Sequence, residues 1–290
     1  MAVILITGAQ GQLGNELKVI SGSYYGYSFI FTDIDTLDIT NKEQTEQFIA
    51  ENKPDWIINC AAFNSVDRAE TEKDKAMLIN GTSVRNITGA IDGTGCRLIH
   101  LSTDYVFDGA STIPYTEYSI PNPLSAYGQS KLAGEKVAMM HSGFMIIRTS
   151  WLYSSFGNNF VKTIMKIAGE ADSVKVVVDQ TGTPTYAADL AEVIMKIVAG
   201  VIRNQIAFNT GIYHYSNEGV CSWFDFAEAI IRDAGLECRV IPIQTAEYGA
   251  AAKRPAYSVL DKSKIRENYE ISIPHWPDSL QKCINLIKKL

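Results

Sequence analysis

Long hydrophobic runs are missing from the sequence. No apolar stretch in its 290 residues reaches the length of about 18 that a membrane-spanning helix needs. The N-terminal run Val3 to Ile6 is short and leads into a glycine-rich turn, without the charged region and cleavage site of a signal peptide. Lysine and arginine form no cluster and the net charge is −6, so we expect neither a nucleic-acid partner nor a membrane partner.

Cysteine is scarce, and its spacing fits neither a disulfide framework nor a metal site. The five cysteines are Cys60, Cys96, Cys221, Cys238 and Cys283. Cys60 and Cys96 lie in apolar, strand-like runs, where a buried free thiol is the expected state. This usage indicates a reducing, cytoplasmic environment. The 46% hydrophobic and 20% charged fractions are typical of a globular chain with an ample core.

Strand-like and helix-like segments alternate along the first half of the chain. Strands are expected over 3–7, 28–32, 56–60, 97–101 and 144–148. Helices are expected over 12–20, over 42–51 with Asn41 as the cap, over a long stretch ending near 91, and over 127–140. Short apolar strands separated by helices predict an α/β fold with a Rossmann-type, doubly wound parallel sheet.

The second half of the chain predicts a smaller lobe beside this sheet. Strands over 174–178 and 212–215, separated by a helix over 187–199, are expected to return to the first domain. A helix over 222–234, a strand over 238–243 and a helix over 278–290 follow. We therefore expect a dinucleotide-binding domain over 1–150 with returning segments near 174–217, and a smaller C-terminal substrate-binding lobe over 151–172 and 218–290.

A glycine-rich turn follows the first predicted strand. Gly8, Gly11 and Gly14 have the spacing G-x-x-G-x-x-G and open the first helix. Glycines permit a tight turn and close backbone approach, and a helix N-terminus offers free N–H groups to a pyrophosphate. Asp33 ends the second strand, where a carboxylate accepts hydrogen bonds from an adenosine ribose and repels a 2′-phosphate. The turn predicts a dinucleotide site, with NAD favoured over NADP.

The fourth strand and the helix after it carry the candidate catalytic residues. Ser102, Thr103 and Asp104 end the strand, and ligands of open α/β sheets bind beyond the carboxyl ends of the strands. Tyr127 and Lys131 are spaced by four residues and share one face of a helix. A lysine beside a tyrosine stabilises the phenolate, so Tyr127 is the expected proton donor to a carbonyl. His100 precedes the strand end and is interpreted as a core residue.

These motifs together resemble the extended short-chain dehydrogenase/reductase family, and more narrowly its dTDP-4-dehydrorhamnose reductase branch. The matching segments run from Ser102 to Gly109, Tyr127 to Glu135, Arg148 to Tyr153, Gly157 to Phe160, Asp179 to Thr185, and through Arg254-Pro255. The resemblance covers most of the chain. It implies that NADH or NADPH reduces the C4 keto group of dTDP-4-dehydro-β-L-rhamnose to give dTDP-L-rhamnose.

The resemblance also implies roles for individual residues. Thr103, Tyr127 and Lys131 would form the catalytic set. The cofactor would be bound by Gly8, Gln10, Gly11, Gln12, Leu13, Gly14, Asp33, Asp38, Ile39, Ala61, Ala62, Phe63, Tyr127 and Lys131. The dTDP-linked keto-sugar would contact Thr103, Asp104 and Trp151, and Arg254 would clamp its diphosphate or remain a solvated surface residue. The resemblance leaves a homodimer open, and we assign no metal ligands.

Other functions of the same fold are left open by the residues. A dehydratase usually has a Glu after the acidic residue that follows the threonine, whereas Tyr105 occupies that position here. An epimerising reductase of the GDP-fucose type needs a Cys/His pair, and Cys221, Cys238, His141 and His214 show no evident pairing. A regulatory subunit, such as that of animal methionine adenosyltransferase, binds a dinucleotide without catalysis. Trp223, Phe224 and Phe226 have helical spacing and are interpreted as packing residues.

Overall fold

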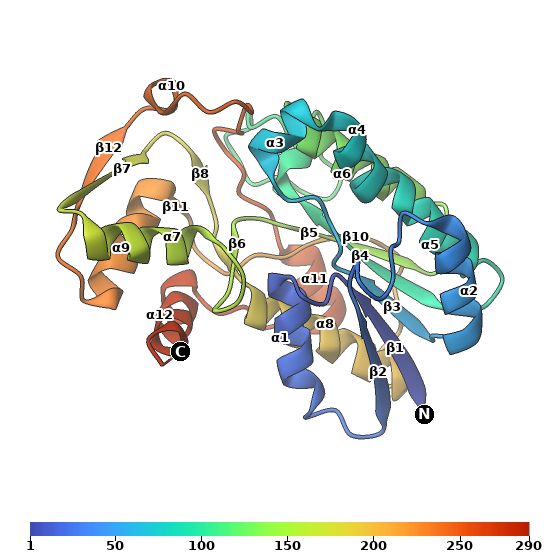
Figure 1. Cartoon of the computed structure of the whole chain (residues 1–290). Coiled ribbons are helices and arrows are strands. Elements are labelled where there is room, and N and C mark those ends of the chain that lie inside the picture. Colours follow the sequence, from blue (N-terminus) through green and yellow to red (C-terminus); the bar gives the residue numbers. More distant parts are fainter. Residues whose placement is uncertain (290) are drawn as a thin grey trace.

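The computed structural model describes residues 1–289, and its main feature is a six-stranded parallel sheet (Figure 1). The strand order is β10-β5-β4-β3-β1-β2, so the chain places the edge strand β2 beside β1, then crosses to the other side of β1 and adds β3, β4, β5 and β10. The strands are β1 (Ala2–Thr7), β2 (Tyr27–Thr32), β3 (Trp56–Asn59), β4 (Arg97–Thr103), β5 (Phe144–Thr149) and β10 (Gly211–His214). The predicted doubly wound α/β sheet is confirmed.

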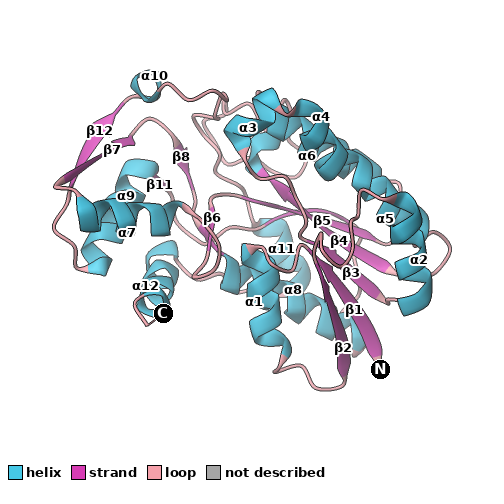
Figure 2. Cartoon of the chain, viewed as in Figure 1, coloured by secondary structure: helices cyan, strands magenta, loops and turns pink. Residues whose placement is uncertain are grey.

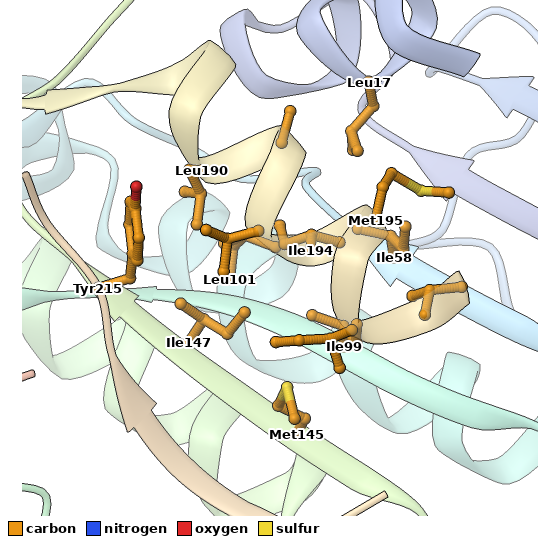
Figure 3. Close-up of a cluster of buried hydrophobic side chains, with 14 of the residues drawn as sticks. Leu17, Ile58, Ile99, Leu101, Met145, Ile147, Leu190, Ile194, Met195 and Tyr215 are labelled. Atoms are coloured by element: carbon orange, nitrogen blue, oxygen red, sulfur yellow. The ribbon is translucent and has the colours of Figure 1, made fainter. Parts of the chain in front are cut away.

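Helices cover both faces of this sheet because its strands are apolar on both sides. Ile4 and Ile6 of β1 pack toward one face, and Leu5 between them packs toward the other. The first face is covered by α1 (Gln12–Ser21), α8 (Ala187–Ile202) and α11 (Ser263–Tyr269). The second face is covered by α2 (Lys42–Asn52), α5 (Ser83–Ala90) and α6 (Ala126–Ala138). Figure 3 shows α8 laying Leu190, Ile194 and Met195 over Ile99, Met145 and Ile147.

The long helix expected to end near residue 91 is broken into four segments. These are α3 (Val66–Thr71), α4 (Lys73–Met77), the π-helix η1 (Leu78–Thr82) and α5. The π-helix lies where the Asn80 side chain holds the loop after β3, accepting from Phe63 N at 2.8 Å and donating to Phe63 O at 3.1 Å. The same amide donates to Ser130 Oγ of α6 at 2.9 Å. A π-bulge at such a point fits its frequent use near functional sites.

The remaining elements form a smaller lobe with its own core (Figure 2). It contains α7 (Phe160–Glu170), α9 (Trp223–Ala234), α10 (Thr245–Tyr248), α12 (Trp276–Ile287) and the paired strands β7 (Ser173–Val177) and β12 (Arg239–Ile243). The short strands are β6 (Leu152–Tyr153), β8 (Thr181–Gly182), β9 (Thr185–Tyr186) and β11 (Cys221–Ser222). Helix α7 and these short strands were not predicted from the sequence.

One strand lies outside the domain to which the sequence analysis assigned it. The strand expected over 174–178 was to return to the first domain, but β7 pairs in parallel with β12 and not with the six-stranded sheet. Val174 and Val176 of β7 pack into the core of the smaller lobe. The predicted helix 278–290 corresponds to α12, and Leu290 lies outside the described residues. None of the helices within residues 1–289 has the length and apolar character to cross a membrane.

Candidate active site

The glycine-rich turn joins β1 to α1 in a conformation that requires glycine. Gly8 has φ +67°, and a Cβ there would lie 2.6 Å from the backbone of Ala61. A side chain is therefore excluded on both conformational and steric grounds. Gly11 caps α1 without a side-chain hydrogen bond to the first turn. The turn thus presents a bare helix N-terminus, which suits the pyrophosphate of a dinucleotide.

A cavity of about 480 Å³ extends from this turn toward β2. Its lining includes the predicted residues Gly8, Gln10, Gly11, Asp33, Asp38, Ile39, Ala61 and Ala62. Asp33 Oδ2 accepts from Gln10 N at 2.8 Å and its Oδ1 accepts from Ile34 N at 2.9 Å, so this carboxylate also fixes the turn. Phe63 does not line the cavity, because it is buried in the cluster that contains Tyr127.

A second cavity, of about 520 Å³, opens at the carboxyl ends of β4 and β5. It shares Gly8, Gly11, Cys60, Ala62 and Asn64 with the first cavity, so the two form one continuous cleft. The predicted residues that line it are Gln12, Leu13, Gly14, Thr103, Asp104, Tyr127, Lys131 and Trp151. The cleft therefore joins the candidate dinucleotide site to the candidate catalytic residues.

Thr103 and Tyr127 come together from β4 and the first turn of α6. Ser125 caps α6 by accepting from Gly128 N at 3.1 Å, which fixes the start of the helix and hence Tyr127. Burial raises the pKa of the Tyr127 phenol to about 12, and a hydrogen bond with Thr103 opposes part of this rise. A phenol with this pKa holds its proton near neutral pH and is placed to donate it in the cleft.

Lys131 lies one turn further along α6 and is also buried. Its ammonium donates to the Leu101 carbonyl at 2.6 Å. Burial lowers the pKa of Lys131 to about 8, while Glu135 and Cys60 raise it. The sequence predicted that Lys131 would lower the pKa of Tyr127, but in this structure burial dominates and the phenol pKa is raised.

Asp104 is a carboxylic acid held almost free of solvent at the cleft. It is 1% exposed, and its Oδ1 accepts from the Thr103 hydroxyl at 3.1 Å. Its Oδ2 has no hydrogen-bond partner among residues 1–289. Burial raises the pKa of this carboxyl to about 6, and the neighbouring hydroxyl groups of Ser258 and Thr103 oppose part of this rise. Buried polar atoms normally have a hydrogen-bond partner, so we expect Asp104 Oδ2 to accept a hydrogen bond from a ligand hydroxyl in the cleft.

Two other predicted substrate residues have different surroundings. Trp151 lines the second cavity and stacks on Trp223 with ring centroids 3.7 Å apart. Arg254 instead forms a bidentate ion pair with Asp67, with Nη2 2.7 Å from Oδ2 and Nη1 3.1 Å from Oδ1. It does not line either cavity, and its guanidinium is already paired without a diphosphate.

Comparison with known proteins agrees with this geometry. Residues 1–289 match the family model described as RmlD substrate binding domain. The chain belongs to this family. The dTDP-4-dehydrorhamnose reductase of Aggregatibacter actinomycetemcomitans is 41% identical, covering 97% of this chain and 98% of that protein. The spore coat polysaccharide biosynthesis protein SpsK of Bacillus subtilis is 40% identical, with 97% and 96% of the two chains covered.

A solved structure of the same kind is similar over the whole chain. The dTDP-4-dehydrorhamnose reductase of Bacillus anthracis, solved in complex with NADP, superimposes with a TM-score of 0.92. It is 41% identical, and 99% of this chain and 100% of that chain are covered. The resemblance drawn from the sequence motifs is confirmed.

Several residues that line the cleft were not predicted from the sequence, or were assigned another role. Asn64, Asn158, Asn159 and Lys75 line the cleft, and Trp223 lines it as well as packing against its helix neighbours. Asn159 caps α7 and also donates to Gln12 Oε1 at 3.0 Å, which ties the smaller lobe to α1. The segment Gly157-Asn158-Asn159-Phe160, which runs into the first residue of α7, was the available sequence signal for Asn158 and Asn159.

Three of the histidines take structural positions. His100 is buried, its Nδ1 lies 3.1 Å from the Asn59 amide, and burial lowers its pKa, in agreement with a core role. His214 Nδ1 lies 3.0 Å from Tyr115 O and His141 Nε2 2.8 Å from Cys96 O. Within residues 1–289 no group of three His, Cys, Asp or Glu side chains could hold a metal ion.

Proposed function

We propose that this chain uses NADH or NADPH to reduce the C4 keto group of dTDP-4-dehydro-β-L-rhamnose, giving dTDP-L-rhamnose. The carrying observation is that Thr103, Tyr127 and Lys131 meet in a cleft continuous with the glycine-rich turn. Relatives at 41% identity bear the name of this reductase, and one was solved with NADP. The residues of the first cavity fit a dinucleotide, because Gly11 at the bare N-terminus of α1 and the Asp33 carboxylate both line it.

The reaction needs a hydride at C4 and a proton at the C4 oxygen. NAD(P)H, when bound, supplies the hydride. Tyr127 donates its phenolic proton to the oxygen, and Thr103 polarises the same carbonyl by a hydrogen bond. Lys131 stabilises the resulting phenolate and orients the nicotinamide ribose. Asp104 Oδ2 accepts a hydrogen bond from a sugar hydroxyl, which supplies the partner that this buried oxygen lacks within residues 1–289.

The alternative reactions receive less support from the same residues. Tyr105 follows Asp104 at the position where a dehydratase would have a second carboxylate. Burial raises the pKa of the Tyr105 phenol above its ordinary value, so this residue does not replace the missing carboxylate as a base. A non-catalytic regulatory subunit would not need the buried catalytic set of Thr103, Tyr127 and Lys131. We propose that 1–150 with β10 and α8 binds the dinucleotide and that the smaller lobe binds the sugar nucleotide.

We also propose that the chain works in the cytoplasm, where thiols stay reduced. Its five cysteines are free, and burial raises the pKa of the Cys60, Cys96 and Cys283 thiols to about 12. Such thiols are poorly reactive. A homodimer stays a prediction, which light scattering of the purified chain would test.

The function is tested by following NADH absorbance with dTDP-4-dehydrorhamnose and with UDP- and GDP-linked keto-sugars as matched controls. Oxidation of NADH with the dTDP sugar, and formation of dTDP-L-rhamnose, are expected. Tight NADH binding without turnover of any keto-sugar would favour the regulatory subunit. Turnover of only the UDP or GDP sugar would assign a different substrate to the same chemistry.

A further inference from the structure

Trp151 has an unusual backbone conformation for its type. It follows β5 with φ +46°, in the left-handed region that a bulky side chain rarely adopts. Such a conformation costs free energy and persists only where the surroundings impose it. Its carbonyl accepts from Thr185 N at 3.2 Å, at the end where β6 pairs with β9. The contacts around the indole therefore hold Trp151 in this conformation.

Trp223 covers one face of the Trp151 indole. The two rings are nearly parallel, with centroids 3.7 Å apart and an interplanar angle of 11°. Trp223 is the first residue of α9, whose N-terminus is fixed by a capping box between Ser222 and Asp225. Phe160 of α7 packs on Trp223 at 4.5 Å between centroids. The supporting ring is thus held by two helices of the smaller lobe (Figure 1).

Gly182 contacts the edge of the same indole. A Cβ at Gly182 would lie 2.6 Å from Trp151 Cε2 and 2.7 Å from Cζ2, and 2.8 Å from Ser258 Oγ. The φ angle of Gly182 is not positive, so the backbone conformation itself would allow alanine. The methyl group of an alanine would instead clash with the Trp151 indole. Trp151 and Trp223 both line the second cavity. The absence of a side chain at Gly182 therefore sets how far the indole recedes from the cleft.

We propose that Gly182 and Trp223 are positioning residues that fix the Trp151 indole against the sugar of the nucleotide-sugar substrate. The proposal rests on the function given above. Trp223 supports the ring from its face, and Gly182 leaves the space that its edge occupies. Trp223 begins α9 and Trp151 lies two residues after β5, and both rings pack against the core of the smaller lobe beside the substrate site.

Two variants disturb the indole in opposite ways. Gly182→Ala adds volume against the ring edge, and Trp223→Leu removes the supporting face without adding volume. Gly169→Ala is the matched control, because Gly169 lies in α7 of the same lobe with open space around its Cβ position. Near-ultraviolet circular dichroism of the free protein reports the indole pair. Steady-state kinetics report KM for the dTDP keto-sugar, kcat, and the Kd of NADH.

We expect both variants, but not the control, to change the near-ultraviolet indole band. KM should rise on the order of tenfold while kcat and the Kd of NADH change less than about threefold, since a misplaced contact weakens substrate orientation. An unchanged indole band in Gly182→Ala would overturn the proposal, as would a wild-type KM in either variant. If Gly182→Ala does not fold, Trp223→Leu decides by KM against kcat and the Kd of NADH, because the loss of its own indole changes the band in any case.

The activity of the wild-type chain and the measurements on the variants test the reductase function and the positioning roles separately. A wild-type chain that turns over no keto-sugar overturns the reductase assignment and with it the sugar as the group that Trp151 contacts. The indole band of unliganded Gly182→Ala, which keeps both tryptophans, still decides whether Gly182 sets the position of Trp151. A wild-type chain that is active, with variants that match it in KM, overturns the positioning roles alone.

Discussion

Glu135 and Arg148 form a buried ion pair one helical turn beyond Lys131. Arg148 Nε donates to Glu135 Oε1 at 2.8 Å and Nη2 donates to Oε2 at 2.7 Å, and their side chains are 0% and 1% exposed. Ser102 Oγ donates to the same carboxylate, so the pair connects α6 to the strand that carries Thr103. The guanidinium also lies 5.0 Å from the Phe107 ring centroid.

Breaking this pair should destabilise the fold strongly. Glu135→Ala leaves the Arg148 cation buried without its carboxylate, which typically costs about 3–5 kcal/mol. We expect the free energy of unfolding in urea to fall by that amount. Glu72→Ala breaks the exposed helical pair with Arg68 and is the control, with a far smaller expected change. A loss in Glu135→Ala no larger than in the control would show that the pair contributes little.

Removing the phenolic hydroxyl should slow the reaction without affecting cofactor binding much. Tyr127→Phe deletes the proton donor while keeping the ring that packs against Tyr105 at 5.6 Å. We expect kcat to fall on the order of 10²-fold or more, the effect of losing a general acid. Fluorescence titration with NADH checks that binding is retained. Turnover close to wild type would exclude Tyr127 as the donor.

The activity should decline in mildly alkaline solution. Burial lowers the pKa of Lys131 to about 8, against the raising effects of Glu135 on its own helix and Cys60 on the β3 side. His100, which also faces this lysine, has a lowered pKa and stays neutral. The ammonium is present below this pKa and is lost above it, so kcat/KM should fall as the pH rises through about 8.

A conservative variant tests this origin of the alkaline limb. Lys131→Arg keeps a positive charge throughout the accessible range, so its lower activity should show no decline between about pH 7 and pH 10. The Tyr127 phenol, with a pKa raised to about 12, titrates outside this range. A wild-type profile that is flat to pH 10 would contradict the prediction.

Asp33 should influence the choice between the two cofactors. Its carboxylate accepts from Gln10 N and Ile34 N, so Asp33→Ala loosens the turn and weakens both cofactors. The loss of bonds to the ribose falls on NADH, while NADPH is relieved of repulsion at its 2′-phosphate. We expect the Kd of NADH to rise roughly tenfold relative to that of NADPH. Asp35→Ala, which removes a contact with the Gln10 side chain at 3.2 Å, is the control, and equal losses in Asp33→Ala would exclude a ribose contact.

Much of the central sheet and the cleft was predictable because its signals are local. The apolar strand β1, the glycines that follow it and the cap of α2 at Asn41 lie within a few residues of the structure they specify. Tyr127 and Lys131 share a helix face whatever the rest of the chain does. Phe63 was predicted from the resemblance, and Arg254 from its place in a loop before Pro255, with a surface position left open; the structure gives both residues other contacts.

By itself, the sequence determined the alternation of strands and helices in the central sheet, the glycine turn and the residue types at the reacting end of the sheet. Periodicity and capping are short-range properties, so they are visible without the fold. Only the tertiary structure decided that β7 pairs with β12, that Asp67 takes the Arg254 guanidinium, and that Trp151 stacks on Trp223. These contacts join segments far apart in the chain, and their partners are selected by shape, burial and charge when the segments pack together.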